Sequence, residues 1–337
     1  MSVIEKEHKA GTDQEYILEA INIKKYFPIK GGVLKKTIGH VKAVDDVSLS
    51  IKRGETLGVV GESGSGKSTL GRVILRLLQQ TEGKIIFEDN DISALGTRKL
   101  RPYRRDMQIV FQDPFASLNP KMSVEELIEE PLIVQTSLKK KERKDKIISL
   151  LQKVGLRSED RLKYPHEFSG GQRQRISIAR ALALNPKFII CDEPVSALDV
   201  SIQAQVLNLM ADLQEEFGLT YLFIAHDLSV VKHISDRIAV MYLGRIAEIA
   251  PKKNLYDQPL HPYTQALLSS VPSIEKRKNR EKIILTGDLP SPSNPPSGCA
   301  FRTRCPKAHE RCAVDRPELI DAGGGHHVAC HLYDKRV

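Results

Sequence analysis

The chain has 337 residues, 41% of them hydrophobic and 28% charged, and it contains no tryptophan. A chain of this length buries a large core and is expected to form one large domain with an appendage, or two domains. No stretch approaches the roughly 18 consecutive apolar residues that span a bilayer, and the polar N-terminus lacks the apolar core of a signal peptide, so the sequence predicts a cytosolic protein. The formal net charge of +9 is compatible with nucleic-acid binding, with attraction to an anionic membrane surface or with a basic solvated surface, and the scatter of the basic residues favours the last. Because no segment resembles an aromatic-studded RNA-binding strand, no nucleic-acid partner is predicted.

The first elements of the chain are predicted to be strands. After a polar tail over residues 1–14, the segment Tyr16–Ile23 alternates apolar and polar residues, which predicts an edge strand. Pro28–Gly39 is rich in glycine and lysine and is expected to be a loop, and Ala43–Ile51 has the pattern of a second strand. These segments predict an antiparallel β edge ahead of the main sheet.

A glycine-rich loop lies between a predicted strand and a predicted helix. Thr56–Val60 is a short apolar run typical of a buried strand, and Lys67–Leu78 carries apolar residues at helical spacing. Glycines in such a loop let backbone N–H groups converge on phosphate oxygens, while Lys67 reaches the β- and γ-phosphates and Ser68 ligates Mg²⁺. The Asn-Lys-x-Asp motif that a GTPase would need is absent from the sequence. The predicted nucleotide-binding residues are Gly61, Glu62, Ser63, Gly64, Ser65, Gly66, Lys67, Ser68 and Thr69.

Acidic residues are predicted at the end of a later strand. Phe188–Cys191 and Tyr221–Ala225 are short apolar runs, which are typical of parallel sheets buried on both faces, with functional groups at the strand ends. Asp192 ends the first run, where its carboxylate can hold Mg²⁺ through water, and Glu193 is the candidate that polarises the attacking water. The preceding stretch Pro114–Leu184 is mostly helical in pattern and is expected to form a helical subdomain.

The composition changes after Pro251, and a domain boundary is predicted near residues 251–272. His261-Pro262-Tyr263-Thr264 is expected to open a helix, a charged segment Glu275–Lys282 follows, and the tail from Gly287 is rich in proline, glycine and cysteine. Cys191, in contrast to the tail cysteines, lies in a predicted buried strand and is expected to be an apolar filler.

Four cysteines cluster in the last forty residues, and their spacing matches no standard zinc ribbon or ferredoxin pattern. Disulfides are not expected in a cytosolic protein. The thiolates are candidates for holding a [4Fe–4S] cluster or zinc, or they remain reduced structural thiols. These cysteines are Cys299, Cys305, Cys312 and Cys330, and the histidines that offer alternative ligands are His309, His326, His327 and His331.

The segment Phe168-Ser169-Gly170-Gly171-Gln172 precedes the acidic strand. Together with the phosphate loop and Asp192-Glu193, in this order, it resembles the signature of ATP-binding cassette (ABC) ATPases, apart from Phe168 at a position where that family usually has leucine. The resemblance covers roughly residues 15–250. It implies an ATP-hydrolysing dimer in which the signature of one subunit contacts the γ-phosphate held by the other. The residues implied to act in trans are Ser169, Gly170, Gly171 and Gln172.

The same resemblance implies roles for further residues. Gln112 resembles the Q-loop glutamine that joins the Mg²⁺ shell, and His226 matches the switch histidine that contacts the γ-phosphate. The catalytic set is then Glu193, His226 and Lys67, and the Mg²⁺ ligands are Ser68, Gln112 and Asp192. Phe27, with Tyr26 as the alternative, is the aromatic residue expected to stack on adenine. The residues that resemble the D-loop, which lies across the dimer interface in the family, are Ser196, Ala197, Leu198 and Asp199.

Other segments resemble the oligopeptide/dipeptide importers within this family. They are Asp113–Pro120, which forms the groove for a membrane subunit in related transporters, His261–Thr264, and the N-terminal Phe27–Gly32 and Val41–Asp45, which resemble the F-type ATPase subunit. The resemblance implies a peptide importer with a second, D-type ATPase as heterodimer partner, two membrane permease subunits and an extracytoplasmic binding protein that selects the substrate. Nickel complexes or sugars are alternative cargoes, and a nucleic-acid regulator is an alternative of another class.

The sequence thus predicts an α/β fold with a P-loop NTPase core of the ABC type. Residues 15–255 are expected to form the ATPase domain, with its helical subdomain at about residues 114–184. Residues 256–337 are expected to form the C-terminal region of the importer subfamily, whose four-cysteine tails are associated with an iron–sulfur cluster. The resemblance places the protein at the cytoplasmic face of the membrane, attached through its partners.

Overall fold

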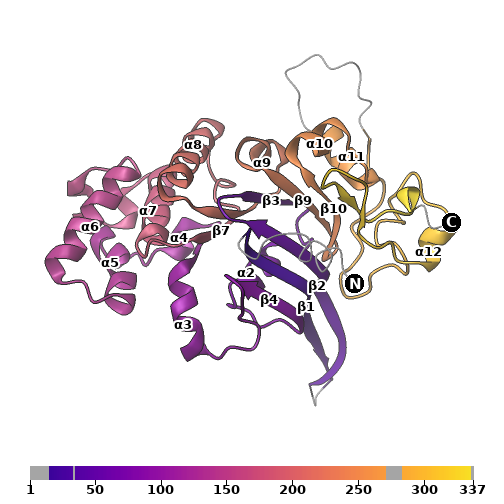
Figure 1. The fold of residues 1–337 in the computed structure, drawn as a ribbon, viewed down its shortest axis with the longest axis horizontal. Coiled ribbons are helices and arrows are strands. Elements are labelled where there is room, and N and C mark those ends of the chain that lie inside the picture. Colours follow the sequence, from indigo (N-terminus) through magenta and orange to yellow (C-terminus); the bar gives the residue numbers. More distant parts are fainter. Residues whose placement is uncertain (1–14, 33–34, 271–282, 335–337) are drawn as a thin grey trace. The chain divides into compact units, whose positions relative to one another are not determined.

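The structure is a computed structural model that describes residues 15–32, 35–270 and 283–334 (Figure 1). The chain divides into two compact units. The first comprises residues 1–52, 56–94 and 225–337, and the second comprises residues 53–55 and 95–224. The predicted N-terminal tail and the charged segment Glu275–Lys282 lie outside the described residues.

The first unit contains a four-stranded antiparallel sheet in the order β2-β1-β4-β5. The strands are β1 (Tyr16–Gly31), β2 (Lys36–Lys52), β4 (Glu82–Phe87) and β5 (Asn90–Asp91). Figure 1 shows β1 and β2 as a long indigo hairpin. β1 pairs with both β2 and β4, so the prediction of an edge strand at its start is wrong.

The predicted loop Pro28–Gly39 is also wrong, because most of it belongs to the ends of β1 and β2. Pro28 pairs with His40, whereas the ladder from β1 to β4 ends at Lys24. Beyond Lys24 one side of β1 has no partner in β4, so the missing N–H of Pro28 breaks no hydrogen bond on that side. This segment, rich in glycine and lysine, is therefore mostly the paired ends of β1 and β2 and not a loop.

The second sheet region of the first unit follows the order β11-β12-β10-β9-β3. β3 (Thr56–Val60) is fully buried and pairs in parallel with β9 (Arg237–Tyr242), which confirms the predicted strand. The remaining strands, which pair antiparallel, are β10 (Arg245–Pro251), β12 (His327–Val328) and β11 (Ile320–Asp321).

Short helices complete the first unit. The predicted helix after the glycine loop is confirmed as α2 (Lys67–Ile74), although it ends earlier than Leu78 because Arg76 has the left-handed φ of 55°. His261 caps α11 (Pro262–Ser269), as the sequence predicts. The other helical segments are α9 (Leu228–Ile234), α10 (Lys252–Asp257), α12 (Glu310–Val314) and η3 (His331–Tyr333).

The second unit combines a parallel sheet with helices. β6 (Met107–Val110), β7 (Phe188–Asp192) and β8 (Thr220–Ile224) pair in parallel in the order β8-β7-β6. Both predicted apolar strands and the predicted helical stretch are confirmed. The helical segments are α3 (Thr97–Asp106), α4 (Pro114–Ser117), α5 (Val124–Gln135), α6 (Lys140–Lys153), η1 (Ser158–Leu162), η2 (Pro165–Glu167), α7 (Gly170–Leu182) and α8 (Val200–Phe217).

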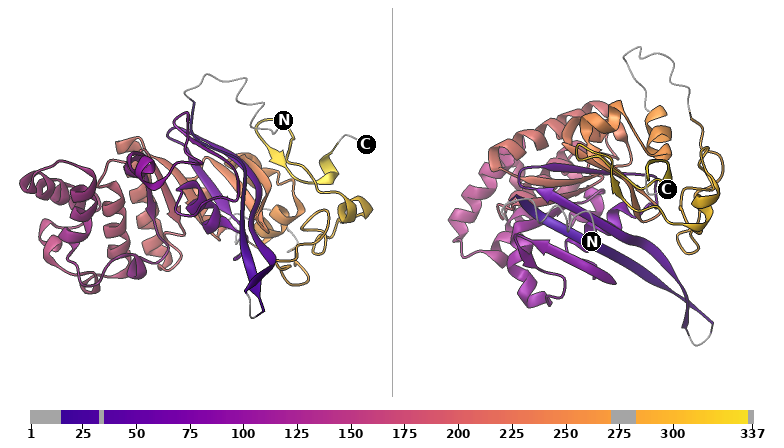
Figure 2. Two further views of the ribbon diagram at one scale, coloured as in Figure 1. Left: turned by 90° about the horizontal axis from the view of Figure 1, so that it is seen from below. Right: turned by 45° about the vertical axis from the view of Figure 1, so that its right-hand side comes forward.

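Figure 2 shows the magenta helices of the second unit gathered into one layer, and the yellow C-terminal segments beside the orange elements of the first unit. Because parallel strands end at a common edge, the residues that follow β6 and β7 are brought close together. Among the helices in the described part of the chain, none is both long enough and apolar enough to cross a membrane.

Candidate nucleotide site

The phosphate loop, residues Gly61–Ser68, connects β3 to α2 in the first unit. Gly61 has φ 154° and Gly66 has φ 100°. A Cβ at Gly61 would lie 2.2 Å from the Met241 carbonyl oxygen, and one at Gly66 would lie 2.0 Å from that of Ala43. Both positions therefore require glycine. Since Gly66 has no side chain to cap the helix, the first-turn N–H groups of α2 are oriented for an anion.

Lys67 lies back over the phosphate loop. Its Nζ donates hydrogen bonds to the carbonyl oxygens of Gly61 at 2.7 Å and Glu62 at 3.0 Å, and the residue is 4% exposed. Ser65 Oγ is buried without a hydrogen-bond partner among the described residues. A bound phosphate would satisfy this hydroxyl, which is the fit expected of an anion site.

His226 belongs to the same unit as the phosphate loop. The Ala225 N–H donates to the Val59 carbonyl oxygen at 3.0 Å, so the chain runs beside β3 just before His226. Asp227 then caps α9 by accepting a hydrogen bond from the Ser229 N–H. His226 is exposed between these two anchored residues. Its contact with a γ-phosphate stays a prediction.

The two predicted aromatic stacking residues differ in their freedom. The Tyr26 hydroxyl donates to Asp45 Oδ1 at 2.6 Å, and burial raises the pKa of this tyrosine. Phe27 is 36% exposed, with Lys25 Nζ 4.9 Å from its ring centre. Phe27 therefore has the freer ring, which favours it for stacking on a base.

The second unit contains the acidic residues Asp192 and Glu193 at the carboxyl end of β7, and Gln112 just after β6. Gln112 Nε2 donates to Glu193 Oε2 at 3.2 Å, so the two predicted site residues are in contact. Asp192 is 3% exposed, and Glu193 has the left-handed φ of 48°, which is rare for a residue with a Cβ. Strained backbone of this kind clusters at functional sites. This arrangement can position a water molecule and help to hold Mg²⁺.

The signature segment, residues Phe168–Gln172, forms the start of α7. Ser169 Oγ accepts the Gln172 N–H at 3.3 Å, and Gln172 Oε1 accepts the Ser169 N–H at 3.0 Å, which is a capping box. The Ser169 hydroxyl still has a hydrogen to donate. The cap therefore presents a helix N-terminus together with a hydroxyl donor, both suited to phosphate.

Residues of the predicted D-loop pack against the signature segment. A Cβ at Gly170 would lie 3.4 Å from Leu198 Cδ2, and one at Gly171 would lie 2.5 Å from Ile202 Cγ2. The Ser196 hydroxyl donates to the Glu193 carbonyl oxygen at 3.0 Å. The sequence did not predict the close approach of Ile202 on α8, which leaves no room for a larger residue at Gly171.

The His261–Thr264 motif anchors the C-terminal region through one buried carboxylate. Glu248 on β10 is 0% exposed and accepts hydrogen bonds from the N–H groups of Leu260 and His261 at 2.8 and 2.9 Å. His326 Nε2 lies 2.6 Å from the same carboxylate. His261 Nδ1 accepts the Tyr263 N–H, and burial lowers the pKa of His261 to about 4. His261 therefore acts here as a neutral helix cap.

The four tail cysteines lie within electrostatic range of one another. Burial raises the pKa of Cys299 and of Cys305, and neighbouring tail cysteines contribute to the rise, while all four tail thiols are free. Burial raises the pKa of Cys330 to about 11, while the Leu332 N–H donates to its sulfur. N–H groups of Phe301 and Lys307 likewise donate to Cys299 and Cys305.

A site for a single metal ion is not formed by these side chains. Within residues 15–32, 35–270 and 283–334, no three or more His, Cys, Asp or Glu side chains are grouped to hold a metal ion. The structure therefore gives no support to the predicted zinc alternative, and it does not contain a preformed ligand set for iron.

Two family models match the chain, an ABC transporter model over residues 44–196 and a model of the oligopeptide/dipeptide transporter C-terminal region over residues 247–312. The oligopeptide transport ATP-binding protein AppF of Bacillus subtilis is 60% identical over 95% of this chain and 98% of its own length. The chain belongs to the ABC transporter ATP-binding proteins. The dipeptide transport ATP-binding protein DppF of Escherichia coli is 51% identical over 96% of both chains.

Solved structures agree with this family. The dimeric ATP-binding cassette MJ0796 bound to ADP and Pi is 32% identical, with a TM-score of 0.62 over 70% of this chain and 98% of that one. CbiO1 of Clostridium perfringens is 28% identical, with the same TM-score over 72% of this chain and 92% of that one. The predicted ABC ATPase fold and enzyme class are confirmed, and the roles of individual side chains in this ABC ATPase stay predictions.

Proposed function

We propose that this ABC ATPase hydrolyses ATP to power the import of peptides across the cytoplasmic membrane, as one subunit of a larger transporter. The observation that carries the proposal is the likeness to peptide and dipeptide transport ATP-binding proteins over nearly the whole chain, at 50–60% identity. The match of the oligopeptide/dipeptide C-terminal region over residues 247–312 supports the same cargo class.

The proposed chemistry begins at the phosphate loop. Lys67 exchanges its hydrogen bonds with Gly61 and Glu62 for the β- and γ-phosphates of ATP, while the first-turn N–H groups of α2 bind phosphate oxygens. Ser68, Gln112 and Asp192 would hold Mg²⁺, which would neutralise charge on the phosphates. Phe27 stacks on adenine.

Hydrolysis itself is assigned to the residues after β7 and β8. Glu193, held by Gln112, orients water for attack on the γ-phosphate. His226 stabilises the charge that develops on the γ-phosphate oxygens. The left-handed φ of Glu193 supports this role, because strained backbone of this kind clusters at functional sites.

The signature segment is proposed to act on the ATP of another subunit. The capped start of α7 at Ser169 offers N–H groups and a hydroxyl to an anion. The proposed binding of ATP by the phosphate loop of the same chain does not use these groups. The partner is a second, D-type ATPase subunit, so the active dimer is a heterodimer. Residues Ser196–Asp199 are proposed to lie at that interface.

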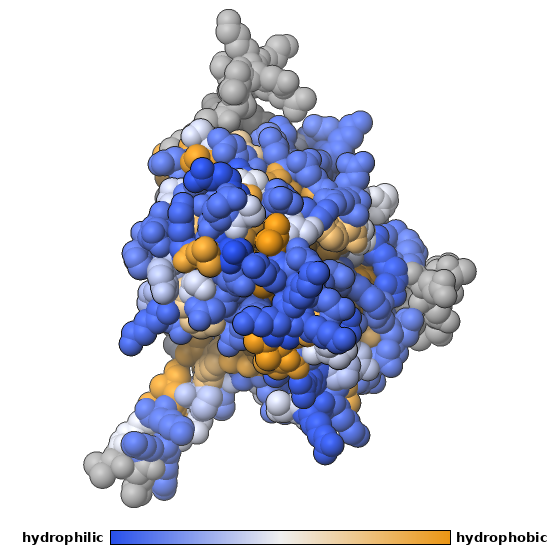
Figure 3. Space-filling view, turned by 90° about the vertical axis from the view of Figure 1, so that its left-hand side faces the viewer, coloured by the Kyte–Doolittle hydropathy of each residue, from blue (hydrophilic) through white to orange (hydrophobic). Residues whose placement is uncertain are grey.

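The conformational change that ATP hydrolysis drives is proposed to act on two membrane permease subunits. This places the chain at the cytoplasmic face of the membrane. Phe115, within the predicted docking segment Asp113–Pro120, is 63% exposed, with the Arg173 guanidinium 3.7 Å from its ring centre. Figure 3 shows the surface on the side where α5 and α6 are drawn in Figure 1, with separate apolar patches in a mostly hydrophilic face. An exposed aromatic held by a cation suits a docking contact. An extracytoplasmic binding protein supplies the peptide to the permeases.

The four tail cysteines are proposed to ligate a [4Fe–4S] cluster. The proposal rests on four cysteines in one short tail whose thiols influence one another electrostatically, because a [4Fe–4S] cluster takes four cysteine thiolates. A cluster would crosslink a tail that has little core of its own. Iron content and absorbance near 400 nm of anaerobically purified protein test this, and colourless, iron-free protein would contradict it.

Peptide uptake by cells tests the function. Cells that lack this chain are expected to stop accumulating a labelled peptide, and a plasmid carrying the wild-type chain restores uptake, whereas Glu193→Gln does not. Parallel assays with labelled nickel and a labelled sugar distinguish the other cargo classes. If cells that lack this chain take up peptide normally but lose nickel or sugar uptake, the peptide proposal is contradicted and the other cargo is indicated.

A further inference from the structure

Glu62, the second residue of the phosphate loop, is held by two residues of the C-terminal region. Its backbone N–H donates to the Tyr263 hydroxyl at 2.9 Å. Its carboxylate accepts from one nitrogen of Arg304, at 3.1 Å to Oε1 and 2.8 Å to Oε2. Tyr263 and Arg304 are 201 and 242 residues away in sequence, yet all three residues belong to the first unit.

These contacts are shielded from solvent. Tyr263 is 0% exposed, the Arg304 side chain is 9% exposed and the Glu62 side chain is 27% exposed. An ion pair with one buried partner is screened less by salt than a surface pair, and its charge-assisted hydrogen bonds are stronger than neutral ones. Burial alone would lower the pKa of Arg304, but its interactions with Glu62 and Tyr242 raise it.

Arg304 lies between Cys299 and Cys305 in the sequence, in a segment held by backbone hydrogen bonds. The Arg304 N–H donates to the Phe301 carbonyl oxygen at 3.0 Å, and the Cys299 N–H donates to the Cys312 carbonyl oxygen at 2.9 Å. The Phe301 ring packs against Tyr242 and Tyr263, with ring centres 5.2 and 5.4 Å away. Phe301 therefore links the backbone of Arg304 to the Tyr263 ring by direct contacts.

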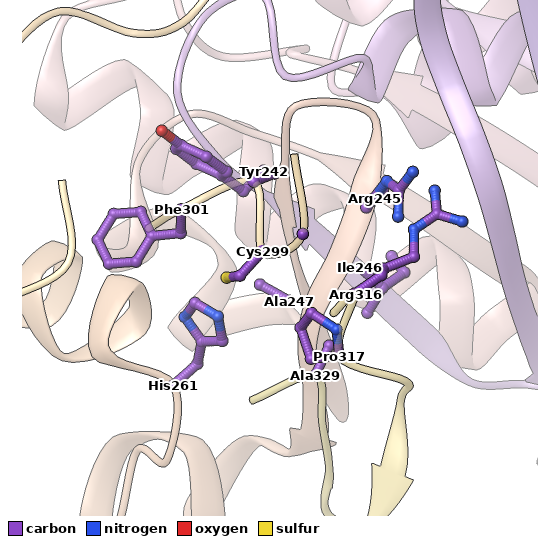
Figure 4. A pocket seen from close by; sticks show the side chains of 12 residues that line it. Tyr242, Arg245, Ile246, Ala247, His261, Cys299, Phe301, Arg316, Pro317 and Ala329 are labelled. Atoms are coloured by element: carbon purple, nitrogen blue, oxygen red, sulfur yellow. The ribbon is translucent and has the colours of Figure 1, made fainter. Parts of the chain in front are cut away.

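Figure 4 shows a cavity that borders Phe301 and Cys299. Phe301, Cys299 and His261 line one side, and Arg245 and Arg316 line the other. The cavity holds about 50 Å³, room for a few water molecules.

The phosphate loop needs both contacts for reasons of charge and of order. An acidic side chain within an anion-binding loop repels phosphate, and Arg304 neutralises that charge in place. The glycines of the loop leave it free to adopt many conformations, and a loop fixed beforehand loses less entropy when it binds its ligand. The Tyr263 contact fixes the loop at the N–H of Glu62, next to the carbonyl oxygens that Lys67 holds.

We propose that Tyr263 and Arg304 are positioning residues of the ATP site, and that the C-terminal cysteine segment thereby sets the nucleotide affinity of the phosphate loop. The proposal rests on ATP binding by the loop and is independent of the transported cargo. Neither residue is assigned a contact with the reacting atoms. Both act through Glu62.

A charge-removal cycle tests Arg304. Arg304→Met is expected to weaken ATP binding by the full-length protein about tenfold, which is the usual size of a lost charge-assisted hydrogen bond. Glu62→Gln, which removes the repelling charge, is expected to restore the affinity of Arg304→Met to within about threefold of Glu62→Gln alone. If Arg304 only anchored the tail, the second substitution would restore nothing. That result would overturn the proposal.

Two further variants separate positioning from stability. Tyr263→Phe keeps the packed ring and removes only the hydroxyl acceptor, so it is expected to weaken ATP binding about fivefold. The melting temperature of the nucleotide-free protein is expected to fall by only a few degrees, because the Glu62 N–H alone loses its partner. Arg302→Met is the matched control, because the Arg302 side chain lies in the same segment but donates its hydrogen bonds to Ser297. Fluorescence titration with an ATP analogue gives the dissociation constants. Unchanged affinity in both Tyr263→Phe and Arg304→Met would refute the assignment.

Discussion

Replacing Glu248 by alanine tests how the C-terminal region is held to the sheet of the first unit. The buried carboxylate accepts hydrogen bonds from the N–H groups of Leu260 and His261 and lies 2.6 Å from His326 Nε2. Each buried donor left without a partner costs about 1–3 kcal/mol, and three of them, with the cavity that remains, cost about 4–6 kcal/mol. That loss is comparable with the roughly 5–15 kcal/mol that stabilises a typical domain.

Hydrogen exchange at the Leu260 and His261 amides measures this loss directly, because exchange reports local opening where a chain of two units need not unfold in one step. Protection at these amides is expected to fall about a thousandfold to ten-thousandfold in Glu248→Ala, at about 1.4 kcal/mol for each factor of ten. Glu248→Gln keeps an acceptor oxygen and is expected to lose much less. Unchanged protection in Glu248→Ala would refute the account of this carboxylate as the anchor.

Glu193→Gln is expected to keep ATP binding but to lower phosphate release at least about a hundredfold, as the loss of a general base does; near-normal release would remove Glu193 from this role. Phe27→Ala is expected to weaken ATP binding about fivefold or more through lost stacking, whereas Tyr26→Phe, measured by the same titration, should leave affinity unchanged; the reverse pattern would exchange their roles. Burial lowers the pKa of His261 to about 4, below its ordinary value, so on acidification the unfolded chain binds a proton at a higher pH than the folded chain does. The free energy of unfolding is therefore expected to fall as the pH drops from about 6.5 towards 4. His261→Asn, which can still cap the helix, should flatten that fall in chemical denaturation, and an equally steep curve would contradict the assignment.

The central strands could be predicted because a strand buried on both faces is a continuous run of apolar residues in the sequence. Thr56–Val60 and Phe188–Asp192 are short apolar runs bounded by polar residues, and every residue of both strands is buried. The polar residues after such runs were placed correctly at strand ends for the same reason. Gln112 and Glu193 are in contact because β6 and β7 pair in parallel.

Other features have no local trace in the sequence. The pairing of β1 with β4 depends on a strand that begins more than fifty residues later, so alternation in Tyr16–Ile23 could not tell an inner strand from an edge. The contact of Arg304 with Glu62 and that of His326 with Glu248 join residues 242 and 78 positions apart. Composition identified the C-terminal tail, but only the fold shows that it reaches the phosphate loop.

Transport by the assembled complex tests the central claim most directly. The measurement is ATP hydrolysis and labelled-peptide uptake by proteoliposomes that contain this chain, its proposed ATPase partner and the two permeases, with and without the peptide-loaded binding protein. The account predicts that the loaded binding protein raises both rates together, and that Glu193→Gln in this chain abolishes peptide uptake. ATP hydrolysis without any peptide uptake, or unimpaired uptake with Glu193→Gln, would contradict it.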